Sequence, residues 1–407
     1  MALRSDLSTA TAVEVPLGTR AVVVGPLLLG PEATESSASL AGEVGRMLDA
    51  WDGPGVVVFA GDLFDLLHRP DPSAALRSHP ELARPLGAFA TRPGRRVISL
   101  PGLRDARLGW DRAARSVLAE SGVEVAALVD LLVDSAAGER RVRVQPGREH
   151  DPRAAPGEGA GPGDTPLAHH LLSEVLPGAG SRRLGWLEGI DRLTDPAALS
   201  RFVVSRLFYR KVARYAWWLL VPLLAAVLFK LPLAYLIPLV GRRAHASAWP
   251  VRVAVVGATT LVDVALVVVA VAILSRRVWA TVAGFSLGEG PAAGAAGAAT
   301  AMADGGPGAG PAANDVPRGA ARELVMGGLA GLVTAHTLAP ELTTLGPGFY
   351  ANCGSAAAVV VERPARLALP SVFVTERQLC WIELEGGAEL HVRLLRSAST
   401  RRGASLA

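Results

Sequence analysis

A chain of 407 residues is long enough for two domains, or for one large domain with insertions. Hydrophobic residues make up 50% of it and its mean hydropathy is +0.33, so we expect part of the chain to lie in a membrane. The small net charge of +4 and the lack of a basic patch interleaved with aromatics exclude a general nucleic-acid-binding signature. Its two cysteines, Cys353 and Cys380, exclude a disulfide framework and fit a reducing compartment.

The first 150 residues alternate strand-like and helix-like segments, and we find no secretory signal peptide in residues 1–16. This alternation predicts βαβ units with a parallel sheet. Sheet-like patterning resumes after residue 323. The predicted strands are Ala21–Val24, Val56–Ala60, Val97–Leu100, Leu329–Thr334, Ala356–Val361, Gln378–Leu384 and Glu389–Leu395, and the predicted helices are Ser39–Trp51 and Arg112–Ser121.

Two long apolar segments interrupt this pattern. Residues 217–240 carry one charge, Lys230, and residues 253–274 carry one charge, Asp263. Because about 20 apolar residues span a bilayer, we expect a transmembrane hairpin with a short connecting loop. Two buried helices of a soluble domain are the alternative.

The distribution of basic residues predicts the orientation of this hairpin. Seven Lys and Arg side chains flank the two segments, and only three lie in the loop between them. The positive-inside rule therefore predicts a multi-pass protein of the inner (plasma) membrane whose α/β domain is cytoplasmic. Residues 288–310 are almost entirely Ala and Gly, which predicts a flexible linker. We expect four parts: the first half of the α/β domain (1–200), the hairpin (201–280), the linker (281–320) and the second half (321–407).

Polar residues follow three of the predicted strands, in the blocks Gly61-Asp62-Leu63-Phe64-Asp65, Pro101-Gly102-Leu103-Arg104-Asp105 and Ala335-His336-Thr337-Leu338. In this order they resemble the blocks of the calcineurin-like metallophosphoesterases. The chain is most similar to membrane-bound, actinobacterial-type members and more distantly similar to UDP-2,3-diacylglucosamine hydrolases. The resemblance covers most of the chain outside the hairpin and linker, and it implies a layered α/β sandwich.

The resemblance also implies a reaction and its residues. Members of this family hydrolyse phosphoester or pyrophosphate bonds with two divalent metals, which activate a bridging hydroxide. Asp62 and His336 match metal ligands, and Arg104 and Asp105 match the end of the family's Gly-Asn-Arg-Asp block, where we expect catalytic roles. Arg104 would contact phosphate or solvate its loop. Asn352 matches a family loop and is expected to be structural.

The chain departs from the family at most of its metal-ligand positions. Five of these positions hold Pro or Leu, whose side chains carry no donor atom, namely Pro26, Leu28, Leu103, Pro146 and Leu338. Asp62 and His336 alone cannot hold a two-metal cluster, because stable sites need three or four protein ligands. We therefore expect no cofactor, or a weakly bound Mn, Fe or Zn ion with low occupancy at Asp62 and His336.

Three functions remain open at this point. The first is a membrane-anchored member of the family that is inactive or impaired and binds or scaffolds. The second is an active phosphohydrolase at the cytoplasmic leaflet, with a reduced metal site around Asp62, Asp105, His150 and His336. A two-helix transporter is the third, and it lacks an evident binding cavity. The expected partners are the bilayer and a phosphorylated or lipid-linked ligand, and no nucleic acid.

Lys230 and Asp263 give a first testable prediction. In a hairpin they lie at nearly the same depth, ten residues from the loop on either side. We expect them to pair, because a lone charge in hydrocarbon costs several kcal/mol. Lys230→Leu and Asp263→Leu should each lower the melting temperature in detergent, and the double variant should recover much of the loss. Additive losses would show that the two side chains do not meet.

Overall fold

The structure is a computed structural model of the chain. It describes residues 10–67, 69–151, 154–155, 187, 189–194, 198–199, 201–210, 254–262, 265, 269, 273, 314–365 and 370–397. The chain divides into two compact units. One comprises Met1–Ala197, Gly308–Val361 and Val374–Ala407, and the other comprises Ala198–Pro307 and Glu362–Phe373.

The first unit contains two six-stranded sheets, each with parallel and antiparallel pairs. The first sheet has the order β14-β13-β2-β3-β4-β5. Its strands are β2 (Arg20–Val24), β3 (Gly55–Phe59), β4 (Arg95–Ser99), β5 (Val123–Val125), β13 (Cys380–Gly386) and β14 (Leu390–Arg396). The four strands β2 to β5 are parallel, and β13 joins them antiparallel to β2. Strand β3 is buried along its whole length, as its continuous apolar run requires.

The second sheet has the order β1-β6-β7-β8-β10-β9. Its strands are β1 (Thr11–Val15), β6 (Val129–Val133), β7 (Arg140–Val144), β8 (Gly331–Thr334), β9 (Glu341–Leu345) and β10 (Gly348–Asn352). The parallel pair β7 and β8 joins the N-terminal and C-terminal parts of the chain. A separate two-stranded sheet is formed by β11 (Ala358–Arg363) and β12 (Val372–Arg377).

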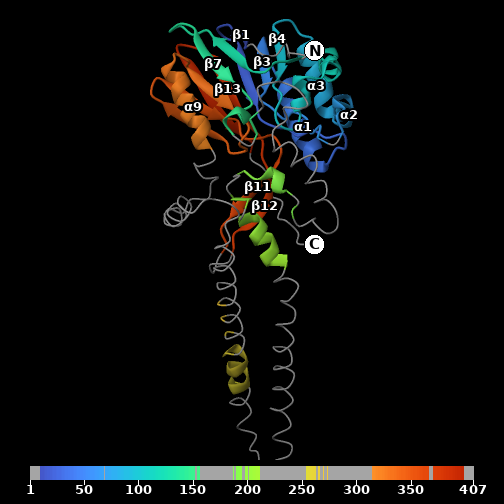
Figure 1. Ribbon diagram of the computed structural model, residues 1–407, viewed down its shortest axis with the longest axis vertical. Coiled ribbons are helices and arrows are strands. Elements are labelled where there is room, and N and C mark those ends of the chain that lie inside the picture. The colour runs from blue at the N-terminus through green and yellow to red at the C-terminus, as the bar shows by residue number, and fades with distance from the viewer. Residues whose placement is uncertain are drawn as a thin grey trace, which may run out of the picture. The chain divides into compact units, whose positions relative to one another are not determined.

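The two large sheets pack face to face, with helices on both outer sides (Figure 1). One apolar cluster contains side chains from both inner faces, including Val23, Val58, Val144 and Val333, all fully buried. A second cluster joins the outer face of the first sheet to its helices, and α9 (Asp315–Met326) covers the second sheet. The helices over the first sheet are α1 (Glu35–Asp49), α2 (Pro72–Ser78), α3 (Pro80–Ala90) and α4 (Arg112–Glu120).

This mixed α/β architecture confirms the predicted fold class at its coarse level. The parallel sheet that the βαβ pattern predicts is present in β2 to β5, and β13, β9 and β6 add antiparallel pairs that were not predicted. Helix α1 begins four residues earlier than predicted. Thr34 caps it by accepting a hydrogen bond from the Ser37 N–H while the Ser37 hydroxyl accepts one from the Thr34 N–H, a reciprocal cap that apolar periodicity does not reveal.

No helix within the described ranges is long and apolar enough to cross a membrane. Most residues of the two predicted spans, 217–240 and 253–274, and the whole predicted linker, 288–310, lie outside those ranges. The transmembrane hairpin therefore stays a prediction.

Candidate functional site

Five loops that follow β2, β3, β4, β7 and β8 meet at one edge of the sandwich. Parallel strands place their following loops at the same edge of a sheet, which accounts for the first three. The loops of the second sheet reach them directly: Arg148 Nη1 donates to the Gly102 carbonyl at 2.9 Å. A Cβ atom added at Gly61 would lie 3.3 Å from Pro146 Cβ. This meeting point brings the candidate residues together.

Asp62, which follows β3, is held in a constrained backbone conformation. Its φ of 48° lies in the left-handed region, which is uncommon for residues other than glycine. The Asp62 carbonyl accepts hydrogen bonds from the N–H groups of Leu27 and Leu28, at 3.2 and 3.0 Å. Its Oδ1 accepts one from the Arg104 N–H at 2.6 Å. A Cβ atom at Gly102 would lie 2.4 Å from this oxygen, so only glycine allows the approach.

Asp105 lies beneath this contact and is fully buried. Its Oδ1 accepts from the Gly102 N–H at 2.6 Å, and its Oδ2 accepts from the Phe64 N–H at 3.3 Å. Burial, followed by the nearby charge of Asp62, raises the pKa of Asp105 to about 8. The two peptide N–H groups and the positive charge of Arg148 oppose this shift. Asp105 therefore cross-links the loops after β3 and β4, and its raised pKa favours the protonated form.

Arg104 forms a buried ion pair with Asp65. The Nη1 of Arg104 lies 2.7 Å from Asp65 Oδ2, and the two side chains are 7% and 23% exposed. Of the two alternatives predicted for Arg104, solvation of its loop does not agree with this burial. A second guanidinium, that of Arg148, lies beside the carboxylates, where it lowers the pKa of Asp105. Two arginines thus supply positive charge within the cluster.

His336 pairs with Asp151 rather than with Asp62. The His336 Nε2 lies 3.2 Å from Asp151 Oδ2. The neighbouring His150 has its Nε2 2.5 Å from the amide nitrogen of Gln145. Burial lowers the pKa of His150, the Glu149 charge opposes this, and the nearby His336 lowers it further. Because the amide donates, His150 accepts as a neutral ring.

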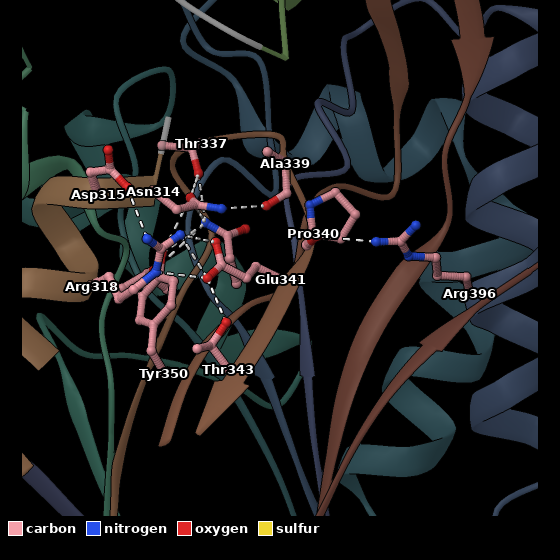
Figure 2. Close-up of polar contacts among 12 residues, drawn as sticks. Asn314, Asp315, Arg318, Thr337, Ala339, Pro340, Glu341, Thr343, Tyr350 and Arg396 are labelled. Atoms are coloured by element: carbon pink, nitrogen blue, oxygen red, sulfur yellow. Dashed lines mark hydrogen bonds and ion pairs between the residues drawn. The ribbon is translucent and has the colours of Figure 1, made fainter. Parts of the chain in front are cut away.

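The loop that carries His336 is fixed by a buried polar network (Figure 2). The Asn314 side chain donates to the Ala339 carbonyl at 3.0 Å, and its Oδ1 contacts the Thr337 hydroxyl. Asn352 donates to Thr337 Oγ1 at 2.7 Å and accepts from the Gly354 N–H at 2.8 Å. Asn352 is therefore structural, as the sequence predicts.

An ion pair at Glu341, the first residue of β9, extends this network (Figure 2). The guanidinium of Arg318, on α9, forms two hydrogen bonds with the Glu341 carboxylate, at 2.8 and 2.9 Å. It also contacts Asp315 at 2.8 Å. These contacts link α9 to β9, the strand that follows the His336 loop. The loop is therefore held on both sides by well-packed elements.

The side chains at this edge do not fit a two-metal cluster. Three of the apolar replacements, Pro26, Leu103 and Pro146, are buried, and the other two, Leu28 and Leu338, are half-buried. They occupy space without offering a donor atom. Over the described ranges, no group of three or more His, Cys, Asp or Glu side chains is arranged to hold a metal ion.

A pocket of about 260 Å³ lies next to the cluster. Asp65 and Leu28 line it, together with the N-terminal residues of α1. Two arginines, Arg69 and Arg192, also line it. Its volume is slightly below the range of about 300–1,000 Å³ that ligand pockets usually have. It has room for a small group such as a phosphorylated headgroup.

Comparison with known proteins found no matching family model and no matching curated protein. The site is therefore interpreted from its own residues. Arg148 was not predicted as a site residue, although it lies two residues after Pro146, one of the five predicted ligand positions that hold Pro or Leu. The signal that could have identified it is a basic residue placed where a metal ligand is missing.

The buried Arg104–Asp65 pair predicts a clear stability difference. Arg104→Met keeps the alkyl chain but leaves the Asp65 carboxylate without this partner. It should lower the free energy of unfolding by roughly 3 kcal/mol, measured by urea denaturation. The matched control is Arg96→Met, which breaks the solvent-exposed pair with Glu124 and should cost less than about 1 kcal/mol. Equal losses in the two variants would contradict the burial of the first pair.

Asp105 predicts a pH dependence of stability. Between its ordinary pKa of 3.8 and about 8, the folded state holds a proton on this carboxyl group that the unfolded state releases. The contribution of Asp105 to the free energy of unfolding should therefore decrease as the pH rises through this interval, and stay constant above it. Asp105→Asn should remove this slope. Parallel pH profiles for wild type and variant, from urea denaturation at pH 5 to 9, would contradict the raised pKa.

Proposed function

We propose that the chain is a membrane-anchored protein of the calcineurin-like metallophosphoesterase type that binds a ligand and does not catalyse metal-dependent hydrolysis. One observation carries the proposal: each acidic residue at the strand ends has a partner within the protein, although Asp65 Oδ1 is buried without one. Asp62 accepts from the Arg104 N–H, Asp105 accepts from two further N–H groups, and Asp65 pairs with the Arg104 guanidinium.

The fold supports the family part of the proposal. Two packed sheets with outer helices agree with the layered sandwich that the sequence blocks imply. The polar blocks lie after β3, β4 and β8, and the loop with Pro26 and Leu28 follows β2, in the chain order of the family's blocks. This agreement in order and position is stronger support than any single block.

The charges support the loss of metal chemistry. In a two-metal site, divalent cations neutralise the carboxylates that hold them. Here Arg104 and Arg148 supply positive charge, and burial raises the pKa of Asp105, which favours its uncharged form. The cluster is therefore close to neutral with its own residues, and a dication would have to displace hydrogen bonds that hold the loops.

The adjoining pocket supports a binding role. Arg69 and Arg192 line it beside the N-terminus of α1, and Arg69 is paired with Glu32, another lining residue, at 3.2 Å. Guanidinium groups and helix N-termini both favour anions. We therefore propose a phosphorylated or lipid-linked ligand for this pocket.

Exposed apolar side chains support the membrane anchor. Residues 254–262 form a helical stretch within the second predicted span. Val255, Leu261 and Val262 on it are 55%, 72% and 58% exposed. Successive exposed aliphatic side chains on a helix are typical of contact with lipid. The surplus of basic residues beside the predicted spans favours a cytoplasmic α/β domain.

Metal analysis tests the proposal. The protein purified in detergent should contain less than one Mn, Fe or Zn ion per chain. Asp62→Ala should change neither this content nor the background hydrolysis of p-nitrophenyl phosphate. The matched control is Asp49→Ala, at an exposed position of α1. Circular dichroism checks that both variants are folded.

One outcome would favour the active phosphohydrolase instead. This is a content of two metals per chain with turnover that disappears in Asp62→Ala and persists in Asp49→Ala. Such a result would mean that the loops rearrange around metal and that a reduced ligand set suffices.

A further inference from the structure

We infer that the helix at residues 199–210 lies in the headgroup layer of an anionic membrane leaflet, with one face buried against its own unit and the other in contact with lipid. The inference rests on the proposed membrane anchor and specifies which surface meets the leaflet and which lipids it prefers. Residues 199 and 201–210 are helical in the structure.

The buried face of this helix is attached to residues 362–373 of the same unit. Ser205 Oγ donates to the Ser371 carbonyl at 2.6 Å, and the Tyr209 hydroxyl donates to the Pro370 carbonyl at 2.7 Å. Phe202 packs edge-on against the Phe373 ring, 5.1 Å between centroids.

An ion pair strengthens this attachment. The Arg201 Nη2 lies 3.0 Å from Glu362 Oε2. Together with the contacts of Phe202, Ser205 and Tyr209, it occupies one side of the helix. The rotational orientation of the helix about its axis is thereby fixed.

The opposite face carries apolar and basic residues at helical spacing. Leu199, Val203 and Leu207 follow one another every four residues, and Arg206 and Arg210 lie on the same stripe. Leu199 and Leu207 are 42% and 39% exposed. Aliphatic side chains bordered by arginines are the pattern of helices that lie in a membrane interface.

The two arginines on this stripe are available for an outside partner. Over the described part of the chain, neither Arg206 nor Arg210 forms an ion pair with an acidic side chain. Arg210 is exposed, and Arg206 is half-buried, with its Nε buried and without a hydrogen-bond partner. The Arg206 guanidinium lies over the Phe202 ring, 5.2 Å from its centroid. Residues 199–216 contain no Asp or Glu, so the whole segment is basic.

Charge and continuity identify the partner. A surface with unpaired arginines and no acids is complementary to lipid phosphates, and each basic residue near an anionic leaflet contributes about 1 kcal/mol. The described part of the helix stops at residue 210, seven residues before the first predicted span begins, so it lies close to the bilayer if that span inserts. Its exposed leucines therefore meet the acyl-chain boundary while Arg206 and Arg210 meet headgroups.

Spin labelling of the full chain in lipid nanodiscs tests the inference. A label on Leu207→Cys reports the helix face, and a label on Val316→Cys, at a 62% exposed position of α9, serves as the aqueous reference. Both native cysteines are buried, so labelling is specific to the introduced residue. In discs containing 30% phosphatidylglycerol, the label at residue 207 should be several-fold less accessible to a water-soluble nickel chelate than the label at residue 316.

Removing the charges should weaken the docking. Arg206→Gln combined with Arg210→Gln should lower the ratio of docked to undocked helix, reported by the label at residue 207, by roughly fivefold per arginine. Pure phosphatidylcholine discs should lower the same ratio to a similar extent for the helix with both arginines. A matched control is Arg46→Gln on α1, which lies in the other unit and should change nothing.

Three results would overturn the inference. The first is equal chelate accessibility at residues 207 and 316 in anionic discs. The second is a chelate accessibility at residue 207 that is the same in discs with phosphatidylglycerol and in pure phosphatidylcholine discs. The third is efficient cross-linking between labels at residue 207 of two chains, which would make this face a contact between copies. Failure of the chain to enter nanodiscs at all would instead contradict the membrane anchor itself.

Discussion

One apolar layer between the two sheets determines where every polar group of the candidate site lies. Side chains such as Val23 and Val58 from one sheet interlock with Val144 and Val333 from the other, and all are fully buried. Side chains alternate along a strand, so a shift of one residue would turn this layer toward the helices and bring polar groups inside. The register is therefore fixed, and with it the meeting of the loops after β2, β3, β4, β7 and β8.

Once the loops meet, their charges have to be balanced. Asp62, Asp65 and Asp105 lie in one poorly solvated neighbourhood, where three negative charges would repel one another strongly. This repulsion is reduced by peptide N–H groups, by the Arg104 and Arg148 guanidinium groups, and by the raised pKa of Asp105, which favours its uncharged form. The same interactions hold the loops together, so the electrostatics of the site and the stability of the edge are coupled.

Part of this arrangement can be predicted from the sequence, because it depends on local patterns. The apolar runs of β2, β3, β4 and β8 and the polar residues directly after β3 and β4 are visible without a structure. Short strands such as β1, β7 and β9 were not predicted. Each has polar or exposed positions, and β7 contains three arginines, so the apolar pattern is weak. These strands form because a neighbouring strand supplies hydrogen bonds.

The pairing of the site residues was also beyond local reasoning. Arg104 pairs with Asp65, 39 positions away, and His336 pairs with Asp151, 185 positions away. Such contacts depend on which strands are neighbours in a sheet: Asp65 and Arg104 follow the neighbouring strands β3 and β4, and Asp151 and His336 follow the neighbouring strands β7 and β8. A single sequence shows residue types and their order, whereas a contact of this kind requires the three-dimensional packing.

The order of strands also bears on how the chain acquires its structure during synthesis. Each sheet combines strands from before and after the long segment between residues 155 and 314: β13 lies beside β2, and β8 lies beside β7. Until the last hundred residues have left the ribosome, β2 and β7 are sheet edges with unpaired peptide groups, next to an uncovered apolar face. Contacts this distant in sequence form slowly, and open edges of this kind attract other chains. Newly made protein therefore passes through a stage with open sheet edges, and the proposed membrane anchor, if inserted before β13 is made, would keep such incomplete molecules apart.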